Sequence, residues 1–390
     1  MSGPRVLVIG QGPAGLAAAS LLAGDADVTI VANSQGSLGF FSATLDFRSL
    51  DGRGGAVEDP YRAWEDEGRG PAGLLTAVGW KRIWGRYLDL LREVGIPYPH
   101  TLPEKNTWVI SASGAPRRTY LAPDWLLALP EPEPIAFLEI PGLPDTPSHW
   151  LSANFEASTG LRASTASLAD LAEPWDVMRW AGYLDRPEGI ERLLTSLNAV
   201  TGVSRDLPWV MPGVLGIRNT ERLLERCRHE GFRLYEMASV PPSVAGVRLD
   251  ERWRAHLRRQ GVRWRSARVI RIGEGRAELR DGSELPFDAL VRATGGILGG
   301  GIAVRSDFVA VDMLTGEELG KVMEGVPASF GLSRDEPLAA GADVGGSDPA
   351  RWGDGMAHVL ATAYLAASAV RKRLGLGALE DDEEMTRNGK

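Results

Sequence analysis

Residues 5–22 read RVLVIGQGPAGLAAASLL, and this stretch decides the fold. The apolar run Arg5–Ile9 is typical of a short buried strand, and Ala14–Leu22 is typical of a helix rich in Ala and Leu. A G-x-G-x-x-G turn stands between them, and a second apolar run, Val28–Val31, follows the helix. Strand, glycine-rich turn, helix and strand in this order predict the first βαβ unit of a Rossmann-like sheet.

The glycine turn predicts a site for a phosphate-bearing cofactor. Gly10 permits the tight turn after the strand, Gly12 lets the backbone approach a phosphate, and Gly15 allows the helix to pack closely on the strand. The helix N-terminus then presents free N–H groups to the anion. We therefore expect Gly10, Gly12, Pro13, Ala14 and Gly15 to bind the cofactor.

The composition excludes several other classes of protein. The 390 residues are 44% hydrophobic and 24% charged, which is typical of a folded globular chain. A net charge of −8 argues against nucleic acid as the main partner. The single cysteine, Cys227, excludes an internal disulfide and a cysteine-ligated iron–sulfur cluster. Because Cys227 shares a helical face with Leu223, we expect it to be a core residue.

Neither a metal centre nor a membrane span is expected. The five histidines are scattered without metal-ligand spacing. The apolar stretch 6–23 is interrupted by Gly10–Pro13, and the apolar stretch 358–370 is too short to span a bilayer. We expect a cytoplasmic protein that could lie on the inner face of the cell membrane through its partners.

The second strand lacks the acid that normally binds the adenosine ribose. Val28–Val31 is followed by Ala32, Asn33 and Ser34, so Asn33 offers a hydrogen bond but no charge. The adenosine half is therefore held weakly or is absent from the cofactor. Both FAD and FMN remain open at this point, and NAD(P) as the sole cofactor is less favoured.

Two more glycine motifs follow short apolar runs late in the chain. They are Ala293–Gly296 and the stretch from Ala340 through Gly346. Cofactors lie at the carboxyl ends of parallel strands, so both motifs are expected to return to the first one. A helix over about 355–373 would then direct its N-terminus at a flavin ring. The candidate cofactor-binding residues here are Thr294, Gly295, Gly341, Asp343, Gly355 and Met356.

These features predict an α/β protein with a Rossmann-like flavin-binding domain that carries an inserted second domain. The flavin-binding domain is expected to comprise residues 1–50 and 240–380, the inserted domain 51–239, and a disordered acidic tail 381–390. Further helices are expected over 187–199 and 220–229 and after Pro242, and strands near 135–140, 269–272 and 277–280.

Four stretches besides the first turn resemble a known family. They are Phe41–Asp46, Val240–Arg248, Ala293–Gly296 with Gly299–Gly301, and Ala340–Gly341 through Pro349. In this order they are similar to the B subunit of the anaerobic glycerol-3-phosphate dehydrogenases, flavoproteins of the glutathione-reductase-like superfamily. The resemblance spans nearly the whole chain but is loose over about 50–180, and the stretch PPSVAGVR is its most specific part.

The resemblance implies a non-covalent flavin, FMN or FAD, in one subunit of a membrane-associated complex. That complex oxidises sn-glycerol 3-phosphate to dihydroxyacetone phosphate and passes the electrons to quinone. Substrate oxidation would belong to another flavoprotein subunit and the iron–sulfur centres to a third, which is consistent with the single cysteine. This chain would then relay electrons through its flavin.

By position, the resemblance places Ser42 and Thr44 beside the flavin ring, although an exposed turn stabilised by their hydroxyls would explain them nearly as well. Arg248 is a candidate ligand for a phosphate of cofactor or substrate. The residue after Gly341 is Ala342, where the superfamily often has Asp; Asp343 comes one later, which leaves the ribityl contact open. No general base stands out.

Two rival hypotheses remain. The first is a self-sufficient flavin oxidoreductase acting on another small anionic substrate, with His149, His256 or Arg248 in the acid–base role. The second is a non-enzymatic scaffold with a vestigial nucleotide fold, which predicts a colourless protein.

Overall fold

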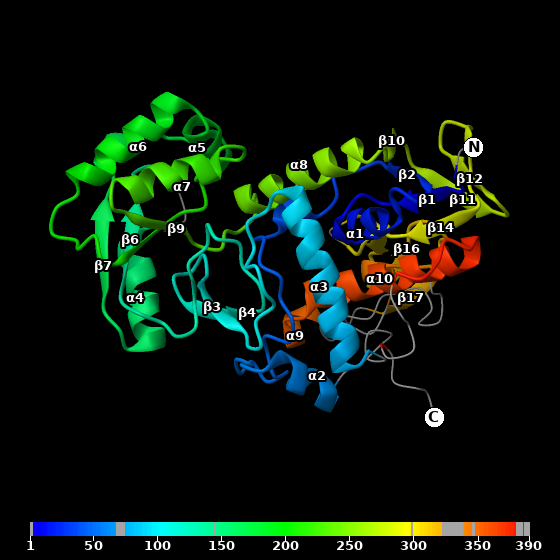
Figure 1. Ribbon diagram of the computed structural model, residues 1–390, viewed down its shortest axis with the longest axis horizontal. Coiled ribbons are helices and arrows are strands. Elements are labelled where there is room, and N and C mark those ends of the chain that lie inside the picture. Colours follow the sequence, from blue (N-terminus) through cyan, green and yellow to red (C-terminus); the bar gives the residue numbers. More distant parts are fainter. Residues whose placement is uncertain are drawn as a thin grey trace.

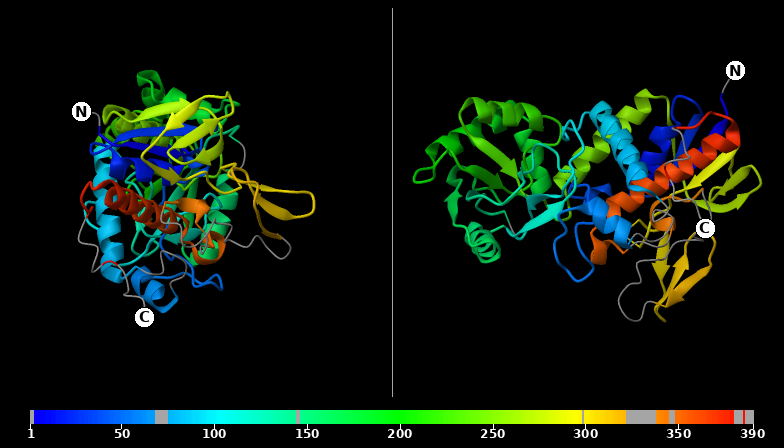
Figure 2. Two further views of the ribbon diagram at one scale, coloured as in Figure 1. Left: turned by 90° about the vertical axis from the view of Figure 1, so that its right-hand side faces the viewer. Right: turned by 60° about the horizontal axis from the view of Figure 1, so that its bottom comes forward.

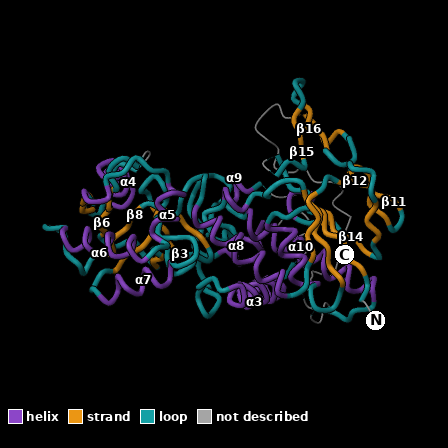
Figure 3. Tube along the Cα trace, turned by 90° about the horizontal axis from the view of Figure 1, so that it is seen from above, coloured by secondary structure: helices purple, strands orange, loops and turns teal. Residues whose placement is uncertain are grey.

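A computed structural model describes residues 3–67, 75–143, 146–297, 299–321, 338–344, 348–379 and 385. It shows an elongated molecule with a parallel sheet toward each end and long helices between them (Figure 1; Figure 3). The predicted motif residues Gly345, Gly346 and Ser347, and nearly all of the predicted acidic tail, lie outside the described residues.

The first parallel sheet has the strand order β10-β2-β1-β14. Its strands are β1 (Arg5–Ile9), β2 (Asp27–Ala32), β10 (Arg263–Ser266) and β14 (Ala289–Arg292), and every neighbouring pair is parallel. Helix α1 (Pro13–Leu22) follows β1 and packs on α10 (Gly355–Leu374). Segments from both ends of the chain thus build one sheet, and the predicted Rossmann-like α/β fold is confirmed.

Two small antiparallel sheets extend this part of the molecule. One consists of β11 (Val269–Gly273), β12 (Arg276–Leu279) and β13 (Glu284–Pro286). The other consists of β15 (Ile302–Val304), β16 (Val309–Asp312) and β17 (Glu318–Lys321), and it projects away from the body (Figure 2). The first is inserted in the chain between β10 and β14, and the second between β14 and η4 (Gly341–Asp343). After each insertion the chain returns to the first parallel sheet.

The middle of the chain contains a second parallel sheet, in the order β7-β6-β8-β9. Its strands are β6 (Ile135–Glu139), β7 (Ala163–Ser167), β8 (Pro208–Met211) and β9 (Arg233–Glu236). Four helices surround it: α4 (Ser148–Thr159), α5 (Val177–Leu184), α6 (Pro187–Ala199) and α7 (Thr220–His229), with a short turn of 3₁₀ helix, η3 (Ala169–Leu171). A small antiparallel sheet, β4-β3-β5, joins it to the rest of the molecule; its strands are β3 (Thr107–Ile110), β4 (Pro116–Thr119) and β5 (Ala128–Leu129).

Helices α8 (Val244–Arg259) and α3 (Ala77–Val94) occupy the middle of the molecule (Figure 1). Helix α8 contacts α1, α3 and α5, and α3 also contacts α10. The remaining elements are α2 (Pro60–Glu67), α9 (Pro349–Trp352) and the 3₁₀ turns η1 (Leu38–Phe40) and η4 (Gly341–Asp343). Since α3 packs on helices of the first sheet although it lies inside 51–239, the domain boundaries stay a prediction.

Candidate functional site

The turn after β1 has the geometry that its glycines predict. Gly10 has a φ of +112°, and a Cβ there would lie 1.9 Å from the carbonyl oxygen of Ala293. A Cβ on Gly15 would lie 2.1 Å from the carbonyl oxygen of Gly10. Around Gly12 the nearest atom to such a Cβ is Ser37 Oγ at 3.7 Å, so a ligand can approach its backbone.

The N-terminus of α1 is open to an anion. Gly12 precedes the helix, no side chain caps it, and its first turn carries no acid. Pro13 occupies a first position where no N–H is needed, and Ala14 follows it. A helix end with free N–H groups and a partial positive charge is a site for phosphate.

The late glycine motifs meet this turn. Thr294, Gly295 and Gly341 line the same cavity as Gly10 and Gly12. Gly341 has a φ of +70°, and a Cβ there would lie 2.7 Å from the Cβ of Ala14. The three motifs, which are far apart in the sequence, therefore share one cavity at the carboxyl ends of β1 and β14.

Asp343 binds the backbone of the neighbouring motif. Its carboxylate accepts hydrogen bonds from Thr294 N and Thr294 Oγ1, both at 2.6 Å. Burial raises the pKa of Asp343 to about 6, against the lowering effect of the two bonds from Thr294. The carboxylate thus links the second motif to the third, and its expected role in binding the cofactor remains a prediction.

The start of α10 lies next to the loop that carries Ser42 and Thr44. The backbone N–H of Ala357, directly after Gly355 and Met356, donates to the carbonyl of Asp46 at 3.1 Å. His358 is buried, and this burial lowers the pKa of its ring. The ring Nε2 lies 3.0 Å from the backbone carbonyl of Val344. This histidine is therefore a structural residue and no free base.

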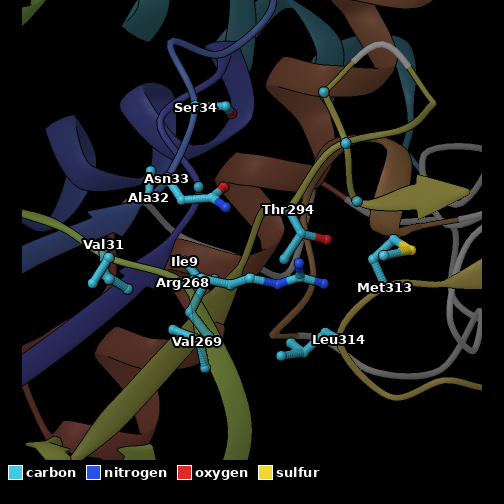
Figure 4. Close-up of a pocket in the computed structure, with 15 residues that line it drawn as sticks. Ile9, Val31, Ala32, Asn33, Ser34, Arg268, Val269, Thr294, Met313 and Leu314 are labelled. Atoms are coloured by element: carbon cyan, nitrogen blue, oxygen red, sulfur yellow. The ribbon is translucent and has the colours of Figure 1, made fainter. Parts of the chain in front are cut away.

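A second cavity, of about 230 Å³, opens at the carboxyl end of β2. Ala32, Asn33 and Ser34 form one wall, and Gly10 and Thr294 connect it to the first cavity. The Asn33 side chain points into it, where an acid is usual (Figure 4).

The other wall of this cavity carries a positive charge that the sequence analysis did not single out. Arg268, directly before β11, extends across the pocket toward the side of Thr294 (Figure 4). Among the described residues that line the pocket, it alone is charged. The cavity has the position of an adenosine site, with the amide of Asn33 in place of the usual carboxylate and the guanidinium of Arg268 on the opposite wall.

Ser42 and Thr44 belong to a polar cluster that also contains Asp46, Arg117 and Thr119. Ser42 Oγ and Thr44 Oγ1 are 2.8 Å apart, and Arg117 donates to both oxygens and to Asp46. Thr119 Oγ1 donates to the same carboxylate at 2.6 Å. Arg117 comes from β4, 73 residues from Thr44, and no pattern in the sequence indicated the pairing.

Arg248 is not at the phosphate site, and this corrects the sequence-based expectation. Its side chain is fully buried and forms a salt bridge with Glu236 at 3.1 Å. It also donates to the carbonyl of Gly216 at 2.6 Å and lies over the ring of Trp125. The guanidinium is occupied by protein groups, so Arg248 joins α8 to the second sheet.

Cys227 is buried in the core as expected, and burial raises the pKa of its thiol to about 12. Within the described ranges, no group of three or more His, Cys, Asp or Glu side chains could hold a metal ion. In the same part of the chain, no helix has the length and apolarity needed to cross a bilayer.

Comparison with known proteins identifies the family. The model of the FAD binding domain family matches residues 5–295. The B subunit of the anaerobic glycerol-3-phosphate dehydrogenase of Vibrio vulnificus (strain CMCP6) is 22% identical over 275 residues. The match covers 66% of this chain and 63% of the relative, so it spans less than two thirds of the relative's length.

The solved structures that it matches are distant. Iminodiacetate oxidase from Chelativorans sp. BNC1 is 16% identical over 77% of this chain and 58% of its own, with a TM-score of 0.27. A thioredoxin reductase from Gloeobacter violaceus is 12% identical over 98% and 99% of the two chains, with a TM-score of 0.20. These superpositions are too loose for a comparison of site residues.

The residues present fit FAD. The open end of α1 and the space above Gly12 suit the pyrophosphate, and the cavity beyond Asn33 suits an adenosine group that FMN lacks. With the match over most of its length, this chain belongs to the FAD binding domain family and is a flavin-dependent oxidoreductase.

Proposed function

We propose that this chain is an electron-relaying flavoprotein subunit of a quinone-linked dehydrogenase that oxidises sn-glycerol 3-phosphate to dihydroxyacetone phosphate. In this role it relays electrons between a substrate-oxidising flavoprotein and an iron–sulfur subunit. The observation that carries the proposal is the similarity to the relative from Vibrio vulnificus, which follows the chain through 66% of its length.

The chain's own residues would hold and orient the cofactor. The turn 10–15 and the N-terminus of α1 would hold the pyrophosphate, and Thr294 and Gly341, which line the same cavity, would enclose it from the opposite side. The start of α10 would lie toward the ring. The redox chemistry would come from the bound FAD, whose ring accepts two electrons and can release them singly.

The histidines support a relay rather than an independent dehydrogenase. When an alcohol is oxidised by a flavin, its carbon gives up a hydride and its hydroxyl group loses a proton, and the proton needs a base near the hydroxyl oxygen. His358 binds backbone carbonyls, His256 lies on α8 beside Glu93, and burial lowers the pKa of both. His149 stands at the start of α4 in the second sheet's layer, away from the glycine motifs. None of these three is placed to serve as that base.

The test is reduction of the bound flavin under anaerobic conditions. The purified chain alone is mixed with glycerol 3-phosphate, and the flavin absorbance is followed. We expect no bleaching by the substrate and rapid reoxidation of dithionite-reduced protein by a soluble quinone. With the substrate-oxidising subunit added, the same substrate should bleach the flavin.

Rapid bleaching by glycerol 3-phosphate alone would contradict the relay. The second candidate, a self-sufficient oxidoreductase for another small anion, is favoured by the cluster around Arg117, whose side chain is 33% exposed beside two hydroxyl groups. A panel of hydroxy acids and amino acids, assayed with an artificial electron acceptor, separates the two functions.

A further inference from the structure

The turn between β1 and α1 separates the phosphate cavity from a larger groove. Gln11 lines the phosphate cavity and also this groove, which has a volume of about 1160 Å³ and runs along α8. Asp250 and Arg254 of α8 line the same groove. An effect of α8 on a cofactor bound at the turn rests on the flavin site of the proposed function.

Arg254 is buried, and its guanidinium binds the two loops that flank the phosphate cavity. Its side chain is only 10% exposed. One terminal nitrogen donates to the backbone carbonyls of Gln11, at 3.2 Å, and Gln35, at 2.8 Å. The other terminal nitrogen donates to Gln11 Oε1, and Nε donates to Asp250 Oδ2 at 2.7 Å. The cation thus joins the turn after β1 to the loop after β2.

A glycine lets the two loops approach each other. Gly36 has a φ of +81°, and a Cβ there would lie 2.8 Å from the carbonyl oxygen of Gln11. The carbonyl oxygens of Gln11 and Gln35 both accept from one nitrogen of Arg254. A charged donor between two carbonyl groups offsets their mutual repulsion, so Arg254 holds the loops in this close arrangement.

The bond from Arg254 to Gln11 also acts on the N–H group of Gly12. The carbonyl of Gln11 and the N–H of Gly12 belong to one trans peptide unit, so they point in opposite directions. The N–H therefore points away from the guanidinium, and Gly12 lines the phosphate cavity. Among the described residues, no group accepts a hydrogen bond from this N–H. Hydrogen bonds in series strengthen one another, so a cation at the carbonyl makes the N–H a better donor.

We propose that Arg254 is a positioning residue for the pyrophosphate of FAD and acts through the peptide group between Gln11 and Gly12. It holds the turn against the loop after β2 and strengthens the Gly12 N–H as a donor to phosphate. Asp250 opposes this effect, because its carboxylate lies 2.7 Å from the guanidinium and offsets part of the positive charge. The charge balance of this pair on α8 therefore sets how tightly the turn binds an anion.

The experiment titrates the apoproteins with FAD and follows the quenching of flavin fluorescence. Arg254→Met should lower the affinity about tenfold, because the Gly12 N–H loses the cation that polarises it. Asp250→Asn keeps an oxygen acceptor for Arg254 but removes the opposing charge, so it should raise the affinity about threefold. Both variants break the same ion pair, so a role confined to packing would change the affinity in the same direction in both.

Arg252→Met is the matched control. Arg252 lies on the same helix and binds Glu221 and the carbonyl of Gly95, away from the turn, so its loss should leave the FAD affinity unchanged. An unchanged affinity in Arg254→Met overturns the proposal, as does an equal fall in Arg252→Met or an affinity that does not rise in Asp250→Asn. If Arg254→Met does not fold, Asp250→Asn carries the test. Because no measurement uses glycerol 3-phosphate or another subunit, this inference and the proposed function can fail independently.

Discussion

The two parallel sheets of this molecule differ in what occupies the helix ends beside them. In the first sheet the N-terminus of α1 has no capping side chain and no acid. In the second sheet, Glu139 at the end of β6 accepts from Ser148 N at 3.1 Å and Ser148 Oγ at 2.8 Å, at the start of α4. The chain's own carboxylate thus fills the place that is left open for a phosphate in the first sheet.

Two more helices beside the second sheet, α7 and α5, also have a carboxylate of the chain at their N-termini. Asp185 Oδ1 accepts from the backbone N–H groups of residues 217, 218 and 219, each at 2.9 Å, just before α7. Asp176 caps α5 by accepting from Arg179 N at 2.8 Å. Topology alone therefore brings helix ends to the carboxyl edge of a parallel sheet, and single loop residues decide whether a ligand can use them.

The strongest way to break this comparison is to give α1 a carboxylate of its own. Gly12→Asp should lower the affinity for FAD on the order of 1000-fold, because the new carboxylate binds the free N–H groups and repels the pyrophosphate. Titration of the apoprotein with FAD, followed by quenching of flavin fluorescence, measures the effect.

Gly12→Ala separates charge from bulk. A Cβ at this position meets no atom closer than 3.7 Å, so the variant should fold and bind FAD more tightly than Gly12→Asp. Apoprotein of Gly12→Asp should unfold at no lower temperature than the parent, since a carboxylate at a helix start is a favourable cap. Equal affinity of the two variants would show that the open helix end is not the phosphate site.

The two Gly12 variants test the glycine turn 10–15, whose structure could be predicted from the sequence. The turn 10–15 depends on local backbone geometry between a strand and a helix that adjoin it in sequence, so its position could be predicted, although Ala293 and Gly341 also lie against it. The amphipathic periodicity that places Trp253 and Leu257 on one face likewise predicts α8.

Of the second sheet, the sequence predicted β6 and the helices α6 and α7, but not the other strands, and it did not predict the partners of Arg248. Strand β7 reads ASTAS, which carries no hydrophobic alternation, and no glycine motif marks its neighbours. The sequence suggested a phosphate as the partner of Arg248. Its actual partners, Glu236 and Trp125, are distant in sequence and meet it only in the folded chain. Arg117 was missed for the same reason, since its contacts with the 42–46 loop are long-range.

Arg248 connects the two regions, and its loss should be the next largest effect. Arg248→Met leaves Glu236 buried without a counter-charge and should lower the free energy of unfolding by about 3 kcal/mol. Chemical denaturation of the apoprotein measures this. FAD affinity of the folded variant should not change, because Arg248 does not line either cofactor cavity.

The control is Arg218→Met, which removes an exposed ion pair with Glu251 and should cost less than about 1 kcal/mol. A double variant with Glu236→Gln should recover part of the stability that Arg248→Met loses. A loss of FAD binding in Arg248→Met with unchanged stability would return Arg248 to the cofactor site.

Arg268 sharpens the comparison within the first sheet, where the cavity expected to hold the adenosine has a guanidinium on one wall and no carboxylate among its described lining residues. Arg268→Ala should weaken FAD about tenfold and leave FMN unaffected, because only FAD reaches the cavity beyond Asn33. Arg271→Ala, which alters an exposed arginine of the adjoining strand paired with Glu278, should change neither affinity. Equal weakening of FAD and FMN would place Arg268 at the shared phosphate and ring instead.

The smallest effect is expected where the protein fills its own helix end. Glu139→Gln keeps an acceptor for Ser148 but removes the charge at the start of α4, so the free energy of unfolding should fall by about 1 kcal/mol or less. The FAD affinity should stay at the parental value, because no strand of the second sheet contributes a residue to either cofactor cavity. A fall in FAD affinity as large as that of Arg268→Ala would contradict this comparison. It would mean that the start of α4 influences the cofactor site, and that the helix ends of the two sheets do not act independently.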